Sequence, residues 1–255
     1  LRFWLSLVVD EEKPKPLPNL DYKIVVGDSL ISKFDGVIVE IDWERKNSVG
    51  QADEYVKNMQ RLLVEVADRQ KQYFNPNNKN KKKLKTEIRN LKILLLINQL
   101  SYNKLAYAEN TPQKGGFMPT AADMRHNARR ELQIASFNNQ INKLRYLFRC
   151  HDEPFHYFEW KLDFPEVLNP YLVNNNGGFD IVIGNPPYLS YFSRQAVKID
   201  EQYLNVLKNK SSFIKDKTKK GRYHSVQFFL DRQIKLMKSE AILFNIIDIS
   251  FFEKA

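Results

Sequence analysis

Hydrophobic residues recur with a helical period through the middle of the chain. Between residues 47 and 150 they return every three or four positions, as they do on one face of a helix. This pattern predicts one helix around residues 56–66, a second around residues 84–95 and a third that begins near Thr120. Thr120 and Asp123 have the spacing of a capping box, in which each side chain bonds the other residue's backbone N–H. We therefore expect a helical insertion, with a long antiparallel hairpin as one arrangement.

Short aliphatic runs come before this helical block. Residues 1–9 have the pattern of an apolar helix, which the prolines of residues 13–18 end because proline removes a backbone donor. Residues 22–28 form a β-branched run that finishes in a turn signal, so they predict a strand. Residues 36–41 predict either a further short strand or the edge of a hairpin.

Sheet character returns after the helical block. Residues 178–184 and 241–247 are continuous apolar runs, of the type that is buried on both faces of a parallel sheet. A helix predicted over residues 225–237 lies between them. This strand–helix–strand order indicates an α/β protein with a doubly wound core.

The composition argues against membrane and secreted proteins. Of the 255 residues, 43% are hydrophobic and 27% are charged, which fits one domain or two small ones. The single cysteine, Cys150, cannot form an internal disulfide, and no apolar run approaches the roughly 20 residues that span a bilayer. We therefore expect a cytoplasmic location. Because the chain begins at Leu1 without an initiator Met and stops after a strand-like run, we also expect a fragment of a longer polypeptide.

The net charge of +10 is concentrated in two stretches. Residues 78–90 carry six cations and one acidic residue, and residues 207–222 carry seven cations and one acidic residue. Such clusters suit a polyanionic partner, because neutralised phosphates release counterions. The alternative is that both are solvated loops or helix faces. The candidate phosphate-binding residues of the second stretch are Lys208, Lys210, Lys215, Lys217, Lys219, Lys220 and Arg222.

A motif whose residues suit ligand binding comes directly after the strand predicted at residues 178–184. In open α/β sheets, ligands bind at this end of a strand. It reads Asn185, Pro186, Pro187 and Tyr188. The two prolines hold the backbone extended and leave their carbonyl oxygens free to accept hydrogen bonds. Asn185 adds a side-chain acceptor, and Tyr188 adds a flat aromatic face. Two rigid acceptors beside a stacking platform suit a planar substrate that bears an amino group; the alternative is a plain proline turn.

Residues 179–188, FDIVIGNPPY, resemble the catalytic motif of adenine-specific DNA methyltransferases. Residues 158–168, FEWKLDFPEVL, are similar to a narrower group, the large methyltransferases of type II restriction–modification enzymes and related phage-defence enzymes. The resemblance covers residues 1–42 and 155–255 well, and the insertion at residues 43–154 only in general character. It implies a partial Rossmann-like sheet of the class I methyltransferase type, divided by that helical insertion.

The resemblance also implies a reaction. S-adenosylmethionine would donate a methyl group to the exocyclic amino nitrogen of an adenine that is flipped out of double-stranded DNA. Asn185, through its side chain, and Pro186, through its main-chain oxygen, would accept hydrogen bonds from that amino group. Pro187 belongs to the same catalytic motif, and Tyr188 would stack on the base.

Cofactor-binding residues are implied on two separate segments. Asp28 occupies the place of the acidic residue that contacts the cofactor's adenine, and Phe228 or Phe229 would line the same pocket. From the residues alone, Asp28 also suits a helix cap, and at least one of the phenylalanines suits core packing. The glycine-rich cofactor loop of the family is not found in this chain, so we expect it upstream of Leu1, with the target-recognition domain downstream.

Two other functions stay open at this point. The missing glycine loop and the helical insertion would also fit a non-catalytic piece that binds DNA or a partner. The proline motif also occurs in enzymes that methylate RNA or protein. A metal site has little support, because the triplet Glu44, Arg45 and Lys46 is frequent by chance and the four histidines lack the spacing of zinc ligands.

Overall fold

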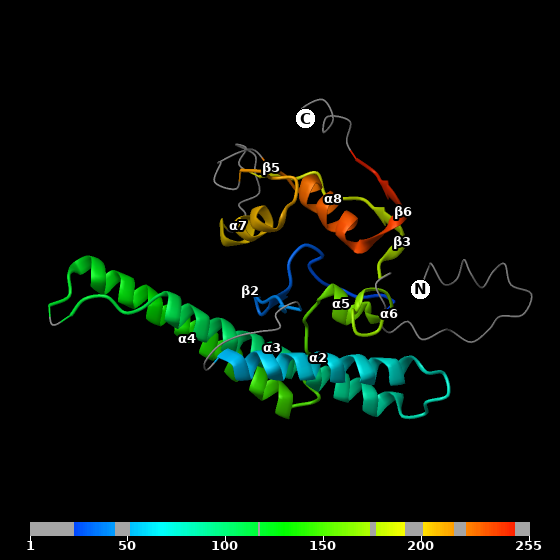
Figure 1. Cartoon of the computed structure of the whole chain (residues 1–255), viewed down its shortest axis with the longest axis horizontal. Coiled ribbons are helices and arrows are strands. Elements are labelled where there is room, and N and C mark those ends of the chain that lie inside the picture. Colours follow the sequence, from blue (N-terminus) through cyan, green and yellow to red (C-terminus); the bar gives the residue numbers. More distant parts are fainter. Residues whose placement is uncertain are drawn as a thin grey trace, which may run out of the picture.

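The computed structural model of the chain describes six ranges of residues. They are 23–43, 52–116, 118–173, 177–191, 201–216 and 223–247. The predictions made for residues 1–9 and 13–18 lie outside these ranges. Figure 1 shows a lower group of long helices and an upper group that contains the parallel strands, with short elements between the two.

The lower group consists of three long helices that pack side by side, α2 (Ala52–Phe74), α3 (Lys81–Asn110) and α4 (Ala121–Arg149) (Figure 1). Each helix runs antiparallel to the next, and the three predicted helices are confirmed. The capping box is also present: the Thr120 hydroxyl accepts from the Asp123 N–H at 3.1 Å, and the Asp123 carboxylate accepts from the Thr120 N–H at 3.0 Å. None of the described helices is both long and apolar enough to cross a membrane.

The main apolar core joins these helices to the short elements between the two groups. Its buried residues come from α2, α3 and α4 and from α5 (Trp160–Asp163). A hairpin of β1 (Lys33–Phe34) and β2 (Val37–Ile38) adds Phe34 and, just after β2, Val39 and Ile41. A buried ion pair, Lys92 Nζ to Asp163 Oδ1 at 2.8 Å, ties α3 to α5. The hairpin edge predicted before the helical block is therefore confirmed, and it packs directly on the helices.

The upper group is built on two parallel strands, β3 (Phe179–Gly184) and β6 (Met237–Asn245). The helix α8 (Ser225–Leu236) leads into β6 and packs against it, which confirms the strand–helix–strand order predicted from the sequence. The remaining elements are α6 (Pro165–Leu168), α7 (Glu201–Lys210), β4 (Ser190–Tyr191) and β5 (Tyr223–His224). Together these elements give a mixed α/β architecture.

One predicted strand is wrong. Residues 23–28 form turns and bends in the structure. The Asp28 carboxylate accepts hydrogen bonds from the N–H groups of Leu30 and Ile31, at 3.0 and 3.2 Å, so the chain turns at this point. A strand also needs a neighbouring strand to bond with, and the described residues place none beside this segment.

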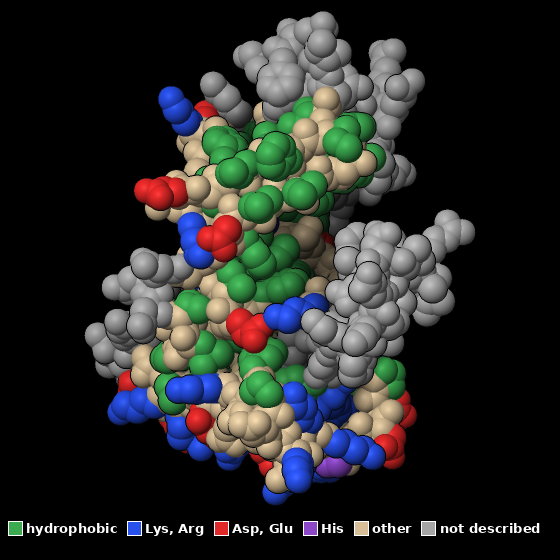
Figure 2. All heavy atoms as spheres, turned by 90° about the vertical axis from the view of Figure 1, so that its right-hand side faces the viewer, with side chains coloured by type: hydrophobic (Ala, Val, Ile, Leu, Met, Phe, Trp, Pro, Cys, Tyr) green, Lys and Arg blue, Asp and Glu red, His purple; other side chains and the backbone are tan. Residues whose placement is uncertain are grey.

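The predicted burial of both sheet faces is also wrong for the part of the chain that the structure describes. The helix α8 packs against β6, whereas Ile183 on β3 is 79% exposed and Phe244 on β6 is 57% exposed. Figure 2 shows hydrophobic side chains gathered over the upper group. Parallel strands are apolar throughout because both faces are normally covered. The apolar runs were thus interpreted correctly as strands, but the described elements do not bury both of their faces.

Candidate active site

The proline motif lies where β3 ends. From Ile181 to Gly184, β3 pairs with β6 in one register that ends at Asn245, and the Ile246 N–H donates to the Gly184 oxygen at 3.1 Å. Asn185 and Pro186 follow at the carboxyl edge of this parallel pair, which is the edge where α/β sheets bind ligands. The structure therefore places the motif at the strand end where the sequence predicted it.

Gly184 allows α8 to approach the strand ends closely. Gln233 on α8 and Asn245 on β6 bond each other through their side-chain amides, at 3.0 and 2.9 Å. A Cβ atom on Gly184 would collide with the Gln233 amide nitrogen and would lie 2.5 Å from Asn245 Oδ1. A side chain at position 184 would therefore displace the paired amides, which already fill the space immediately before Asn185.

Hydrogen bonds fix the proline loop at both ends. The Tyr188 hydroxyl donates to the Ile246 oxygen at 2.8 Å and lies 3.4 Å from Asn185 Oδ1. At the start of α8, the Ser225 hydroxyl donates to the Pro187 oxygen. The loop is thus tied to the end of β6 on one side and to α8 on the other, while about half of the Tyr188 side chain stays exposed.

Two acceptors of the loop stay available. No described residue donates to the Pro186 oxygen, and Asn185 Oδ1 has only the long contact to the Tyr188 hydroxyl, which is weak at that distance. Pro187 differs, because the Ser225 hydroxyl already occupies its oxygen. Of the two prolines, it is therefore Pro186 whose oxygen has no donor among the described residues.

A cavity of about 330 Å³ opens beside Asn185 and Pro186. Its walls are largely apolar, and the Arg232 guanidinium is the one charged group among the described residues that line it. A smaller cavity of about 180 Å³ shares Ser29, Trp160 and Arg232 with the first and reaches Asp28. The aromatic residues of the larger cavity are Trp160, Phe179 and Phe229. The shared wall therefore connects the proline loop to the turn at Asp28.

The residues expected to bind the cofactor come together in the fold. Phe228 is 3% exposed and packs with Leu30 and Ile31, which belong to the turn that Asp28 forms. Phe229 is half-buried and lines the larger cavity. Phe228 is thus a core residue, and Phe229 is the one that borders open space.

Sequence reasoning missed two residues that form the shared wall of the cavities. The Trp160 indole N–H donates to the Ser29 oxygen at 2.9 Å, and the Arg232 guanidinium donates to the Leu30 oxygen at 2.6 Å. Both bonds hold the turn that follows Asp28 against distant parts of the chain. No local pattern reveals them, since each joins a side chain to a backbone carbonyl more than a hundred positions away.

Glu159 is a third residue that sequence reasoning missed, and it lines the smaller cavity. Burial raises the pKa of Glu159 to about 7, against the opposing effect of the Leu162 N–H that donates to its carboxylate at 2.9 Å. The position of Glu159 three residues before Leu162 is the spacing of a helix cap, which is the one sequence signal for its role. The shifted pKa depends on burial and therefore on the tertiary structure.

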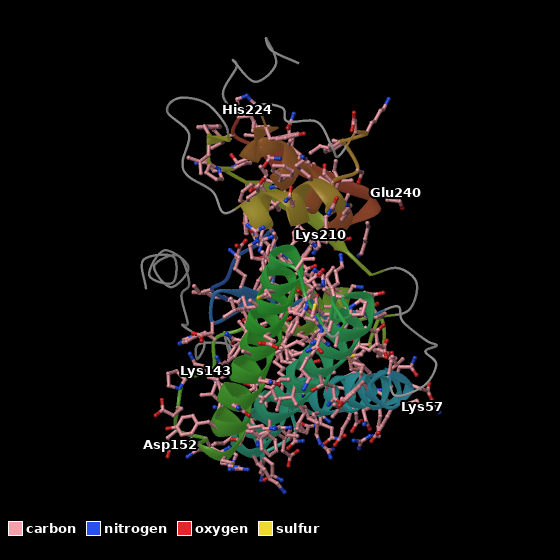
Figure 3. The ribbon with its side chains drawn as sticks, turned by 90° about the vertical axis from the view of Figure 1, so that its left-hand side faces the viewer. Lys57, Lys143, Asp152, Lys210, His224 and Glu240 are labelled. Carbon is pink, nitrogen blue, oxygen red and sulfur yellow. The ribbon has the colours of Figure 1, made fainter. Side chains whose placement is uncertain are left out.

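The basic stretch at residues 207–222 begins in α7, and the structure describes its first part, residues 207–216. Lys208 is 7% exposed, and its ammonium lies 5.3 Å from the centre of the Tyr223 ring. Lys210 pairs with Glu40, and Figure 3 shows it where the upper group meets the helices. Lys215 is exposed. The residues that lie outside the described ranges are Lys217, Lys219, Lys220 and Arg222. Two of the three described lysines are therefore engaged by groups of this chain.

Strand–helix–strand connectivity with a polar loop at the carboxyl edge is typical of ligand-binding α/β proteins. Within that class, this chain belongs to the Eco57I restriction-modification methylase family, whose sequence pattern matches residues 1–255. The chain matches none of the curated proteins and none of the solved structures with which it was compared. Membership of the family identifies a restriction–modification methyltransferase, an enzyme class that acts on DNA, and it confirms this part of the resemblance found in the sequence.

Proposed function

We propose that this protein transfers a methyl group from S-adenosylmethionine to the exocyclic amino group of an adenine in double-stranded DNA. The observation that carries the proposal is the pair of available acceptors, Asn185 Oδ1 and the Pro186 oxygen, beside a cavity at the carboxyl edge of β3. An amino group has two N–H bonds, so two adjacent acceptors match it. Family membership supplies the reaction class, which is methyl transfer to DNA.

The surroundings of these acceptors support recognition of a planar base. The Tyr188 side chain is 51% exposed, and its hydroxyl is anchored on Ile246, which leaves the ring available for stacking. The target adenine would be flipped out of the duplex, because its amino group is inaccessible within the base stack. Hydrogen bonds from the amino group to Asn185 and Pro186 draw the nitrogen lone pair out of conjugation with the ring. Transfer of the methyl group from the sulfonium would break its S–C bond and leave the amine cationic, so its proton could then pass to solvent without a strong general base.

The residues proposed to hold the cofactor are Asp28, Phe228 and Phe229. The two adjoining cavities support this assignment, because together they run from Asn185 past Trp160 to Asp28 and combine apolar walls with polar ends. Bound S-adenosylmethionine would supply an electrophilic methyl group. Asp28 offers a carboxylate acceptor at one end of this space, and Phe229 offers an aromatic wall nearer the other end.

We further assign residues 1–42 and 155–255 to a Rossmann-like methyltransferase core, which residues 43–154 interrupt. The parallel pairing of β3 with β6 through α8 supports this assignment. The proposed DNA contacts are Lys208, Lys210, Lys215, Lys217, Lys219, Lys220 and Arg222. Because Lys215 is exposed whereas Lys208 is buried and Lys210 is paired, Lys215 is the described residue of this stretch to test first.

The test is Asn185→Ala in the complete enzyme, with Asn139→Ala on the exposed face of α4 as the matched control. We expect methylation of DNA to fall by about 100-fold or more, since a single positioned hydrogen-bonding group at a reacting centre contributes on this scale. Binding of S-adenosylmethionine and the folded state should be retained, and the control should methylate normally. Turnover retained by Asn185→Ala would contradict the proposal, and a parallel panel of DNA, RNA and protein substrates would identify a different acceptor.

A further inference from the structure

Groups of this chain surround the Asp28 carboxylate. The backbone N–H groups of Leu30 and Ile31 both donate to Oδ1, at 3.0 and 3.2 Å. The Tyr203 hydroxyl lies 3.2 Å from Oδ1 and 3.0 Å from Oδ2, and Lys33 Nζ lies 3.1 Å from Oδ2. A carboxylate has about four lone-pair sites. Oδ1 therefore already has two donors, and Oδ2 is flanked by the Tyr203 hydroxyl and the Lys33 ammonium, so a ligand reaches Oδ2 only beside or in place of one of these groups.

The donors around Asp28 are not equally removable. The N–H groups of Leu30 and Ile31 belong to the turn that Asp28 itself forms, so they stay with the carboxylate whenever the turn is intact. Tyr203 comes from a different element, α7, which is anchored separately by its buried residues Leu204 and Leu207. A rotation of the Tyr203 side chain would release the carboxylate while α7 keeps its place. The Tyr203 hydroxyl is thus the donor that a ligand can replace at least cost.

The surroundings favour such an exchange. The side chains of Asp28 and Lys33 are 30% and 34% exposed, so solvent and ligands reach them. The Lys33 ammonium lies 3.9 Å from the centre of the Tyr203 ring, within cation–π range. Lys33 therefore contacts both partners of the hydrogen bond and holds the ring beside the carboxylate. The cavity that reaches Asp28 adjoins the one that reaches Asn185.

We propose that the Tyr203 hydroxyl occupies the acceptor position of Asp28 that the amino group of the cofactor's adenine takes, so that Tyr203 and the cofactor compete for one carboxylate. This inference rests on the proposed function, which places the cofactor's adenine at Asp28. It makes Tyr203 a residue that determines cofactor affinity, with Lys33 as the residue that positions it. If Asp28 only forms the turn, the hydrogen bond from Tyr203 stabilises the fold, and the Tyr203 hydroxyl has no influence on the affinity for the cofactor.

The test compares two ligands on two proteins. The ligands are S-adenosylhomocysteine and S-inosylhomocysteine, which carries a carbonyl oxygen in place of the adenine amino group. The proteins are the complete enzyme and its Tyr203→Phe variant, which keeps the ring that packs beside Lys33 and loses only the hydroxyl. We expect Tyr203→Phe to bind S-adenosylhomocysteine about tenfold more tightly by calorimetry, the scale of one hydrogen bond to a charged group at a partly exposed site. Binding of S-inosylhomocysteine should not gain, because that ligand has no amino group to donate.

Tyr157→Phe is the control for loss of a tyrosine hydroxyl as such. The Tyr157 hydroxyl donates to the Val39 oxygen at 3.0 Å and does not contact Asp28. This variant should leave the affinity for both ligands unchanged. An unchanged or weaker affinity of Tyr203→Phe for S-adenosylhomocysteine would overturn the inference, and so would an equal gain for both ligands. If the wild-type enzyme binds neither ligand, the proposed cofactor is wrong and this inference falls with it, an outcome that the wild-type titration alone distinguishes.

Discussion

Glu159 should make the folded protein less stable as the pH rises. Its carboxyl lies beside α5 and the smaller cavity, and burial raises its pKa from the ordinary value of 4.5 to about 7. The perturbation that isolates this effect is Glu159→Gln. Glutamine has the same shape and still offers an oxygen to the Leu162 N–H, but it has no charge to desolvate.

The magnitude follows from the difference between the two pKa values. Between pH 4.5 and about 7, the folded protein keeps a proton on Glu159 that the unfolded chain has already lost. The unfolded state then binds fewer protons than the folded state, so the free energy of unfolding decreases with rising pH, by about 1.4 kcal/mol per unit. Over the whole interval the loss amounts to about 3 kcal/mol. It is complete above pH 7 and absent below pH 4.5.

The assay is urea denaturation of the complete enzyme and of Glu159→Gln at about pH 5 and about pH 8, two conditions on either side of most of this transition. Fluorescence of the adjacent Trp160 reports on the unfolding of this region. We expect the two proteins to have similar stability at the lower pH, and Glu159→Gln to be more stable by about 2–3 kcal/mol at the higher pH. A stability difference between the two proteins that does not change with pH would refute the reasoning.

Three further substitutions test the packing around the site. Lys92→Met leaves Asp163 buried without its ion-pair partner and should lower the free energy of unfolding by about 3–5 kcal/mol in denaturant titrations; a loss below about 1 kcal/mol would mean that water reaches the carboxylate. Gly184→Ala drives a methyl group into the Gln233 amide and should cost about 1–3 kcal/mol. The same variant should also reduce methylation, and wild-type turnover would show that the backbone before Asn185 tolerates displacement. Thr120→Ala removes the cap of α4 and should cost about 1 kcal/mol; faster amide hydrogen exchange confined to the start of α4 would verify it, and unchanged exchange would contradict it.

The elements that could be predicted from the sequence are those whose cause is local. The helical period that defines α2, α3 and α4 is a property of neighbouring turns, and the capping box joins residues only three positions apart. The two apolar runs were identified as strands for the same reason, because aliphatic and β-branched residues favour extended backbone. The strand predicted at residues 22–28 is wrong for the described residues 23–28, because a strand also requires a neighbour to bond with and neighbours are not encoded locally.

The candidate site also has features with a local cause and features that depend on tertiary contacts. The sequence was sufficient to predict the stiffness of the proline loop, the identity of its acceptors and its place after a strand, because these follow from local residues. It could not determine which acceptors stay available. Ser225 occupies the Pro187 oxygen and leaves the Pro186 oxygen open, and that outcome depends on how α8 meets the loop.

The state of the two carboxylates beside the cavities depends on tertiary contacts. Tyr203, 175 positions away in sequence, reaches Asp28 and completes its hydrogen bonds. Burial among α5, the hairpin and their neighbours raises the pKa of Glu159. Both effects depend on how segments that are remote in the sequence pack against each other. Sequence patterns reveal interactions between residues that are close along the chain, so they do not reveal these two.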